Sequence, residues 1–200
     1  MPKALKDNFK IEPVVLTWFF LSGMSALVYQ VIWARELELV FGSTLYAVST
    51  ILSVFMAGLA LGSILFGKIA DKHALPLRLY GYIELGIGVY ALLTPWAFKL
   101  LGVIQQTLPD SLRAGGAGFN PFSFFFSFVI LIIPTTFMGG TLPILSKAII
   151  RSYRELGSKV STLYFINTLG AATGAFLAGF VLIAAFGMMV PLAVTSTDAM

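Results

Sequence analysis

The chain has 200 residues, of which 58% are hydrophobic and 11% charged, and its mean hydropathy is +0.91. This composition excludes a soluble domain built around one core and predicts a polytopic membrane protein surrounded by a lipid bilayer. The absence of cysteine excludes disulfides, thiolate metal sites and cysteine nucleophiles. The net charge of +4 lies in clusters that flank apolar segments, so it indicates membrane topology and no nucleic-acid partner.

Five apolar segments are long enough to cross a bilayer, so we predict an all-α transmembrane bundle that forms a single domain over residues 13–200. A cytoplasmic N-terminal lead, residues 1–12, precedes it. The predicted helices cover residues 13–33, 44–70, 77–99, 122–150 and 160–186. The remaining residues, 187–200, reach only about 21 Å at ~1.5 Å per residue, so they predict a partial sixth crossing. We therefore expect a fragment, an unusual five-helix protein, or a chain whose last segment a partner completes.

The second predicted helix carries small residues at four-residue spacing. Gly58 and Gly62 form a GxxxG pair, and Ser63 with Gly67 repeats the spacing, which is typical of a membrane helix that packs closely against another. The residues that follow, up to Asp71 and Lys72, resemble the signature loop between the second and third helices of major facilitator transporters. That partial resemblance implies a similar helix-loop-helix and a major-facilitator-like half.

Glu84, in the third predicted helix, is the most informative single residue. An ionised carboxylate within a membrane helix costs about 2.5 to 3.5 kcal/mol by insertion scales, so it should be paired, protonated or in a wet cavity. One interpretation is a proton or cation site, such as a ligand for an amine. The other is a structural hydrogen bond or ion pair to a neighbouring helix.

The fourth predicted helix is interrupted by Pro134, Gly139, Gly140 and Pro143. Two prolines remove two backbone donors and the glycine pair permits a bend, so we predict a kink or local unwinding. The freed carbonyls would take hydroxyl partners from nearby threonines or line a water-filled cavity. Such a break is either a plain kink or part of a transporter's substrate site.

The fifth predicted helix carries a second series of small residues that includes Gly170 and Gly174. We expect this series to face the one in the second helix, because smooth surfaces pack well together. Asn167 lies about as far from its basic loop as Glu84 does from its own. The three residues Glu84, Asn167 and Tyr164 are therefore predicted to form one polar, ligand-binding cluster in a pocket bounded by the third, fourth and fifth helices.

The distribution of Lys and Arg predicts the orientation of the chain. Ten of these residues lie at the amino terminus and after the second and fourth predicted helices, against three on the opposite side. By the positive-inside rule the amino terminus is cytoplasmic, and Glu84 and Asn167 lie in the cytoplasmic half of the membrane. We expect the bacterial inner membrane as the location.

Several sequence blocks together resemble the membrane region of bacterial spermidine synthase-like proteins, in which a major-facilitator-like region is fused to an aminopropyltransferase. The blocks are residues 22–37 (SGMSALVYQVIWAREL), 42–44 (GST), 57–63 (AGLALGS), 138–143 (MGGTLP) and 163–171 (LYFINTLGA). The resemblance implies a polyamine-related role, with a cytoplasmic synthase domain or other membrane subunits as partners.

The catalytic part of that family has no counterpart in this sequence. There is no glycine-rich strand-to-helix turn for a decarboxylated S-adenosylmethionine and no aspartate pair for an amine, so no catalytic residue, cofactor or metal ligand is assigned. Three functions remain open. They are a membrane anchor or module of a polyamine synthase-like system, a transporter half for a cationic small molecule, and a structural subunit of a larger membrane complex.

Overall fold

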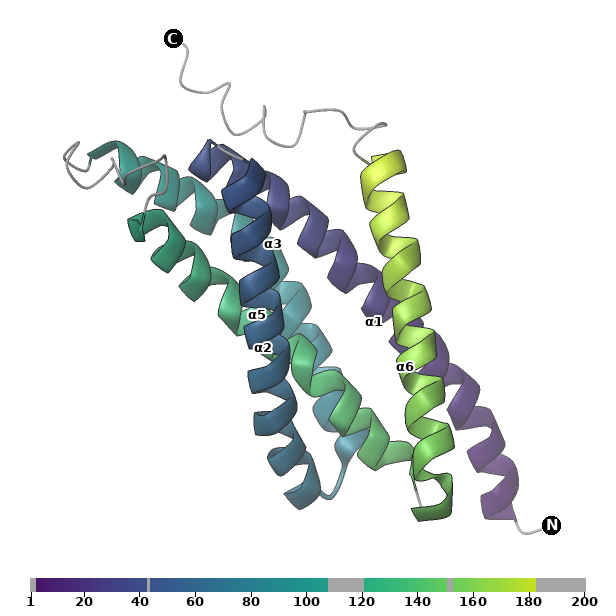
Figure 1. The fold of residues 1–200 in the computed structure, drawn as a ribbon. Helices are drawn as coiled ribbons and strands as arrows, with labels where there is room; N and C mark the ends of the chain where they lie inside the picture. The colour runs from purple at the N-terminus through teal and green to yellow at the C-terminus, as the bar shows by residue number, and fades with distance from the viewer. Residues whose placement is uncertain (1–2, 43, 108–120, 151–152, 183–200) are drawn as a thin grey trace.

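The structure is a computed structural model that describes residues 3–42, 44–107, 121–150 and 153–182. The described residues form five long helices and no strand (Figure 1), which confirms the all-α bundle. The helices are α1 (Lys3–Phe41), α2 (Thr44–Lys72), α3 (Pro76–Thr107), α5 (Pro121–Ile149) and α6 (Tyr153–Phe176), and α6 continues as the π-helix η2 (Leu177–Leu182). All five are long and apolar enough to cross a membrane, so the fold is that of a multi-pass membrane protein.

Three helices extend well beyond their predicted bounds. α6 begins at Tyr153, seven residues before the predicted start at residue 160. α1 includes residues 3–12 of the expected lead and those expected as a connection after residue 33, and it ends where Gly42 adopts φ +64°. There the N–H of Gly42 donates to the Glu38 carbonyl at 2.8 Å, a glycine-terminated helix end. α3 continues to Thr107, eight residues past the predicted end at residue 99. The predicted sixth crossing, residues 187–200, lies outside the described residues.

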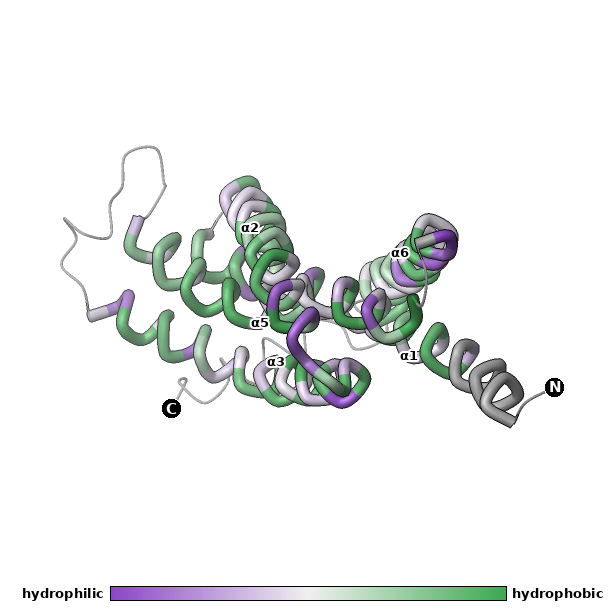
Figure 2. Tube along the Cα trace, turned by 90° about the horizontal axis from the view of Figure 1, so that it is seen from below, coloured by the Kyte–Doolittle hydropathy of each residue, from purple (hydrophilic) through white to green (hydrophobic). Residues whose placement is uncertain are grey.

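The helices form two groups that share α1. α5 packs along both α2 and α3, and α6 packs chiefly against α1 (Figure 1). Seen from below, α6 stands on the far side of α1 from α3 (Figure 2). Apolar residues, drawn in green, occur along every helix (Figure 2). The start of α1, the turn between α2 and α3, and the end of α5 lie at the same end of the bundle (Figure 1). Among the described residues, α6 therefore joins the other helices chiefly through α1, with a small contact between α5 and α6.

The first series of small residues packs against α5. An added Cβ on Gly58 would collide with the Thr135 side chain, and one on Gly62 would collide with the Thr136 carbonyl. Gly139 of α5 lies in turn against the backbone of Leu59. Close backbone approach is what such residues permit where lipid offers no hydrophobic drive for association.

The second series packs against α1, so the expectation that the two series face each other is wrong. Gly170 and Gly174 of α6 lie against the backbone carbonyls of Phe20 and Met24. Small residues determine how closely a neighbour can approach, but any helix backbone can use the space. Here α5 and α1 each supply a partner surface, and the two series remain apart.

The local unwinding predicted between Pro134 and Pro143 does not occur, because α5 is one continuous helix from Pro121 to Ile149. Pro134 has no N–H for the carbonyl of Ile130, four residues earlier. The Tyr90 hydroxyl of α3 donates to that carbonyl at 2.8 Å. A neighbouring helix thus supplies the donor that the proline lacks, and the local unwinding is avoided.

The other residues of the predicted break, Gly140 and Pro143, pack against α2. Gly140 lies against the ring of Phe66, and an added Cβ on Gly67 of α2 would be 3.9 Å from the Pro143 Cβ. The threonines bond within α5, since the Thr135, Thr136 and Thr141 hydroxyls all donate to carbonyls three or four residues earlier.

Pro95 in α3 is accommodated in a similar way. It leaves the Ala91 carbonyl without its helical donor, and the Thr94 hydroxyl donates to that carbonyl at 2.7 Å. The same hydroxyl accepts a hydrogen bond of 2.9 Å from the indole N–H of Trp33 on α1. Side-chain hydrogen bonds at two prolines therefore connect α1, α3 and α5.

Candidate functional site

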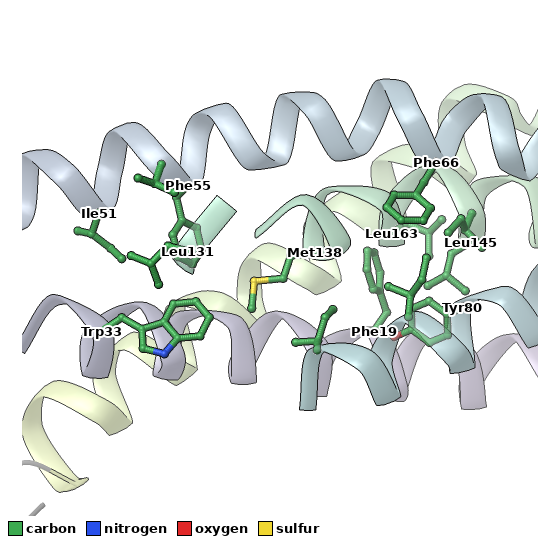
Figure 3. Packing of buried hydrophobic residues seen from close by; sticks show 14 of the residues in the cluster. Phe19, Trp33, Ile51, Phe55, Phe66, Tyr80, Leu131, Met138, Leu145 and Leu163 are labelled. Carbon is green, nitrogen blue, oxygen red and sulfur yellow. The ribbon is translucent and has the colours of Figure 1, made fainter. Parts of the chain in front are cut away.

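Buried side chains form one hydrophobic cluster along the bundle (Figure 3). Trp33 and Phe55 lie towards one end of it, and Phe19, Tyr80 and Leu145 lie towards the other. Polar groups of α1 and α3 lie beside the end that contains Tyr80. The site is built from these groups.

Glu84 of α3 faces α1. The Ser22 hydroxyl donates to its Oε1 at 2.6 Å, and the pair is partly buried. α3 begins at Pro76, eight residues earlier, so Glu84 lies about 12 Å along the helix at ~1.5 Å per residue. This interhelical hydrogen bond is the structural role that the sequence left open as one alternative for Glu84.

No cation neutralises Glu84 within the part of the chain that the structure describes. The ion pair recorded there joins Arg35 and Glu38, at 3.9 Å on the surface of α1. Lys147, near the end of α5, is exposed and makes no ion pair with Glu84. The carboxylate can therefore bind a cation from outside the bundle, which an existing ion pair would have prevented.

Tyr80 lies one helical turn before Glu84 and is 9% exposed. Its hydroxyl is buried and makes no hydrogen bond of normal geometry to a described residue, but Glu84 and Ser22 both lie close enough to interact with it. Buried hydroxyls are nearly always hydrogen-bonded in folded proteins. Tyr80, Ser22 and Glu84 therefore form one polar cluster beside the groove.

A groove of about 530 Å³ opens over these residues, between α1 and α3, with Leu145 of α5 also lining it. Its lining residues are Val15, Trp18, Leu21, Ser22, Ser25, Leu77, Tyr80, Gly81, Glu84, Leu85 and Leu145. A smaller cavity of about 70 Å³ shares Ser22, Ser25 and Glu84 with it and extends to Tyr29, Gly88 and Met138. Glu84 thus lines both spaces. A groove of this size is in the range of small-molecule sites.

Two of the three predicted cluster residues line neither space. Asn167 of α6 lies over Gly23 of α1, where an added Cβ would be 2.7 Å from its Oδ1. Tyr164 is 62% exposed. The groove is bounded by the first, third and fourth helices in chain order, and α1 takes the place that was predicted for α6. Equal depth along two helices does not determine which faces meet.

The α1 residues of the site were missed, although the sequence contains a signal for them. Ser22, Ser25 and Tyr29 recur at intervals of three and four residues, which places them on one face of a helix. Tyr80 and Glu84 share a face of α3 for the same reason. A polar face on the first helix opposite a carboxylate on the third is a pattern that could have located the groove.

The loop-signature residues Asp71 and Lys72 lie in the last turn of α2, exposed, and line neither space. Only residues 73–75 separate α2 from α3, so the chain does form a helix-loop-helix here.

The fold and the site together define a multi-pass helical membrane protein with one carboxylate in a largely apolar groove. Comparison of the chain with protein-family models, curated proteins and solved structures finds no match.

Proposed function

We propose that the chain is the integral membrane module of a spermidine synthase-like protein, non-catalytic by itself, and that it holds an organic amine against Glu84. The sequence blocks that resemble that family support the first part of the proposal. The groove supports the second part, because Glu84 is a carboxylate without a cation partner among the described residues. The module would anchor or serve a cytoplasmic synthase domain, with its amino terminus in the cytoplasm of a bacterial inner membrane.

An amine fits the groove chemically. Its ammonium group would pair with Glu84 and so remove the cost of an ionised carboxylate in an apolar surrounding. It also donates hydrogen bonds, which the carboxylate can accept. Ser22 already donates to Glu84 and would keep the carboxylate in place.

The test is equilibrium binding of labelled amines, both spermidine and a simple alkylamine, to the purified protein in lipid nanodiscs. We expect at least one of them to bind saturably and the binding to be lost in Glu84→Gln. Glu36→Gln is the matched control, because Glu36 is an α1 carboxylate that lines neither space. Binding that is unchanged in Glu84→Gln, or absent for every amine, would refute the amine site.

A transporter-like half is a second candidate, and the smaller cavity favours it. This cavity extends from Glu84 towards Met138 of α5, further along the bundle than the groove. A cation could then move past the carboxylate. Uptake of labelled amine into proteoliposomes that exceeds uptake into empty vesicles would support transport, and equal uptake would remove it.

A further inference from the structure

The described lining of the groove is largely apolar and includes one charged side chain, Glu84. Ser22, Ser25 and Tyr80 are the described lining residues that carry hydroxyls, and the Tyr80 hydroxyl is itself buried. The remaining lining is aliphatic or aromatic, apart from Gly81. A ligand that matches this surface has one positive charge at one end and an apolar body.

The walls of the groove continue onto the outer surface of the bundle. Trp18 of α1 is 61% exposed and Leu85 of α3 is 66% exposed, and both line the groove. Both residues belong to candidate membrane spans, so the groove opens at the depth of the bilayer. A sideways opening at that depth is one that a ligand dissolved in lipid can enter.

We propose that the groove binds an amphiphilic monoamine, a molecule with a single ammonium group and one apolar chain, which enters from the bilayer. This inference rests on the amine site proposed above and narrows its ligand. The ammonium pairs with Glu84, and the apolar chain lies along Trp18, Leu21 and Leu85.

Two other amine classes fit less well. A polyamine such as spermidine carries several ammonium groups, and the lining residues that the structure describes offer one carboxylate, so the other charges would be desolvated without a partner there. An aminophospholipid carries a phosphate beside its ammonium, and none of the described lining residues is a Lys, Arg or His that could neutralise it.

The experiment is competition against labelled n-decylamine on the protein in phosphatidylcholine nanodiscs, with n-decylamine, n-decanol and spermidine as competitors. We expect decylamine to compete at a concentration at least tenfold below that of either of the others. Decanol has the same apolar chain as decylamine but no positive charge. Spermidine has several positive charges but no long apolar chain.

A second pair of variants tests the groove without altering the carboxylate. Gly81 lines the groove and has open space around an added Cβ, so Gly81→Leu should fill the groove while the helices stay in place. Gly102 on the same helix also has open space but does not line the groove, which makes Gly102→Leu the control. We expect decylamine binding to weaken at least tenfold in Gly81→Leu and to be unchanged in Gly102→Leu.

The outcomes separate this inference from the proposed function. Spermidine that competes as well as decylamine would overturn the monoamine inference and leave the amine site standing. Displacement of decylamine by phosphatidylethanolamine in the nanodisc would also overturn the monoamine inference and leave the amine site standing. Unchanged decylamine binding in Gly81→Leu would have the same consequence. No saturable binding of any amine would overturn both.

Discussion

The hydrogen bond from Tyr90 to the Ile130 carbonyl gives a quantitative test of how α5 tolerates its first proline. Tyr90→Phe removes a single hydroxyl, and with it the 2.8 Å hydrogen bond to a carbonyl that Pro134 leaves without a helical donor. Interhelical hydrogen bonds in membrane proteins average about 0.6 kcal/mol and reach about 1.7, and a partly buried carbonyl left without a donor belongs near the middle of that range. We therefore expect Tyr90→Phe to lower the free energy of unfolding by about 1 kcal/mol, measured by reversible unfolding in mixed detergent micelles.

The decisive measurement is the same substitution in a Pro134→Ala background. An alanine restores the N–H at position 134, so the Ile130 carbonyl regains its helical donor and Tyr90→Phe should cost less than half as much. Tyr82→Phe is the matched control, because Tyr82 lies on the same helix with 71% of its surface exposed. If Tyr90→Phe lowers the free energy of unfolding equally with and without Pro134, the reasoning is refuted. This holds whether Pro134→Ala alone raises or lowers the stability.

Two further substitutions test the helix interfaces by the same unfolding measurement. Gly139→Ala places a Cβ against the Leu59 backbone and should destabilise by about 1 to 3 kcal/mol. Gly102→Ala, in open space, should be neutral or stabilising by up to about 1 kcal/mol, and an equal response of the two glycines would contradict the α2–α5 packing. Thr94→Val removes the acceptor for Trp33 and the donor at the Pro95 gap, and it should cost about 2 kcal/mol for two hydrogen bonds. Thr94→Ser keeps the hydroxyl and should retain most of the stability, whereas equal losses in the two variants would exclude the hydrogen bonds as the cause.

The number and nature of the helices could be predicted from the sequence because membrane spans depend on local composition and length. Their ends were less predictable, since a polar stretch can continue a helix, as it does in α1 beyond residue 33. The effect of Pro134 was also beyond prediction. Its consequence depends on Tyr90, 44 positions away in the chain, and sequence spacing does not show that the two meet.

The residues of the candidate site were also only partly predictable from the sequence. Glu84 could be identified from the cost of a carboxylate in a membrane helix, which is a property of that residue alone. Its partners depend on how each helix is rotated about its own axis. Depth along the helix suggested Asn167, but packing turns Asn167 towards Gly23 and brings Ser22 to Glu84.

The pairing of α1 with α6 has a consequence for how the protein is made. The α1 carbonyl of Met24 meets Gly174, and 150 positions separate the two residues along the chain. Chains grow at about 5 to 20 residues per second, so roughly 8 to 30 s pass after Met24 is added before its partner is synthesised. During that interval the face of α1 that will receive α6 must be covered by lipid or by the insertion machinery. The bundle is therefore completed in time order, with α2, α3 and α5 able to pack before the first helix acquires its last neighbour.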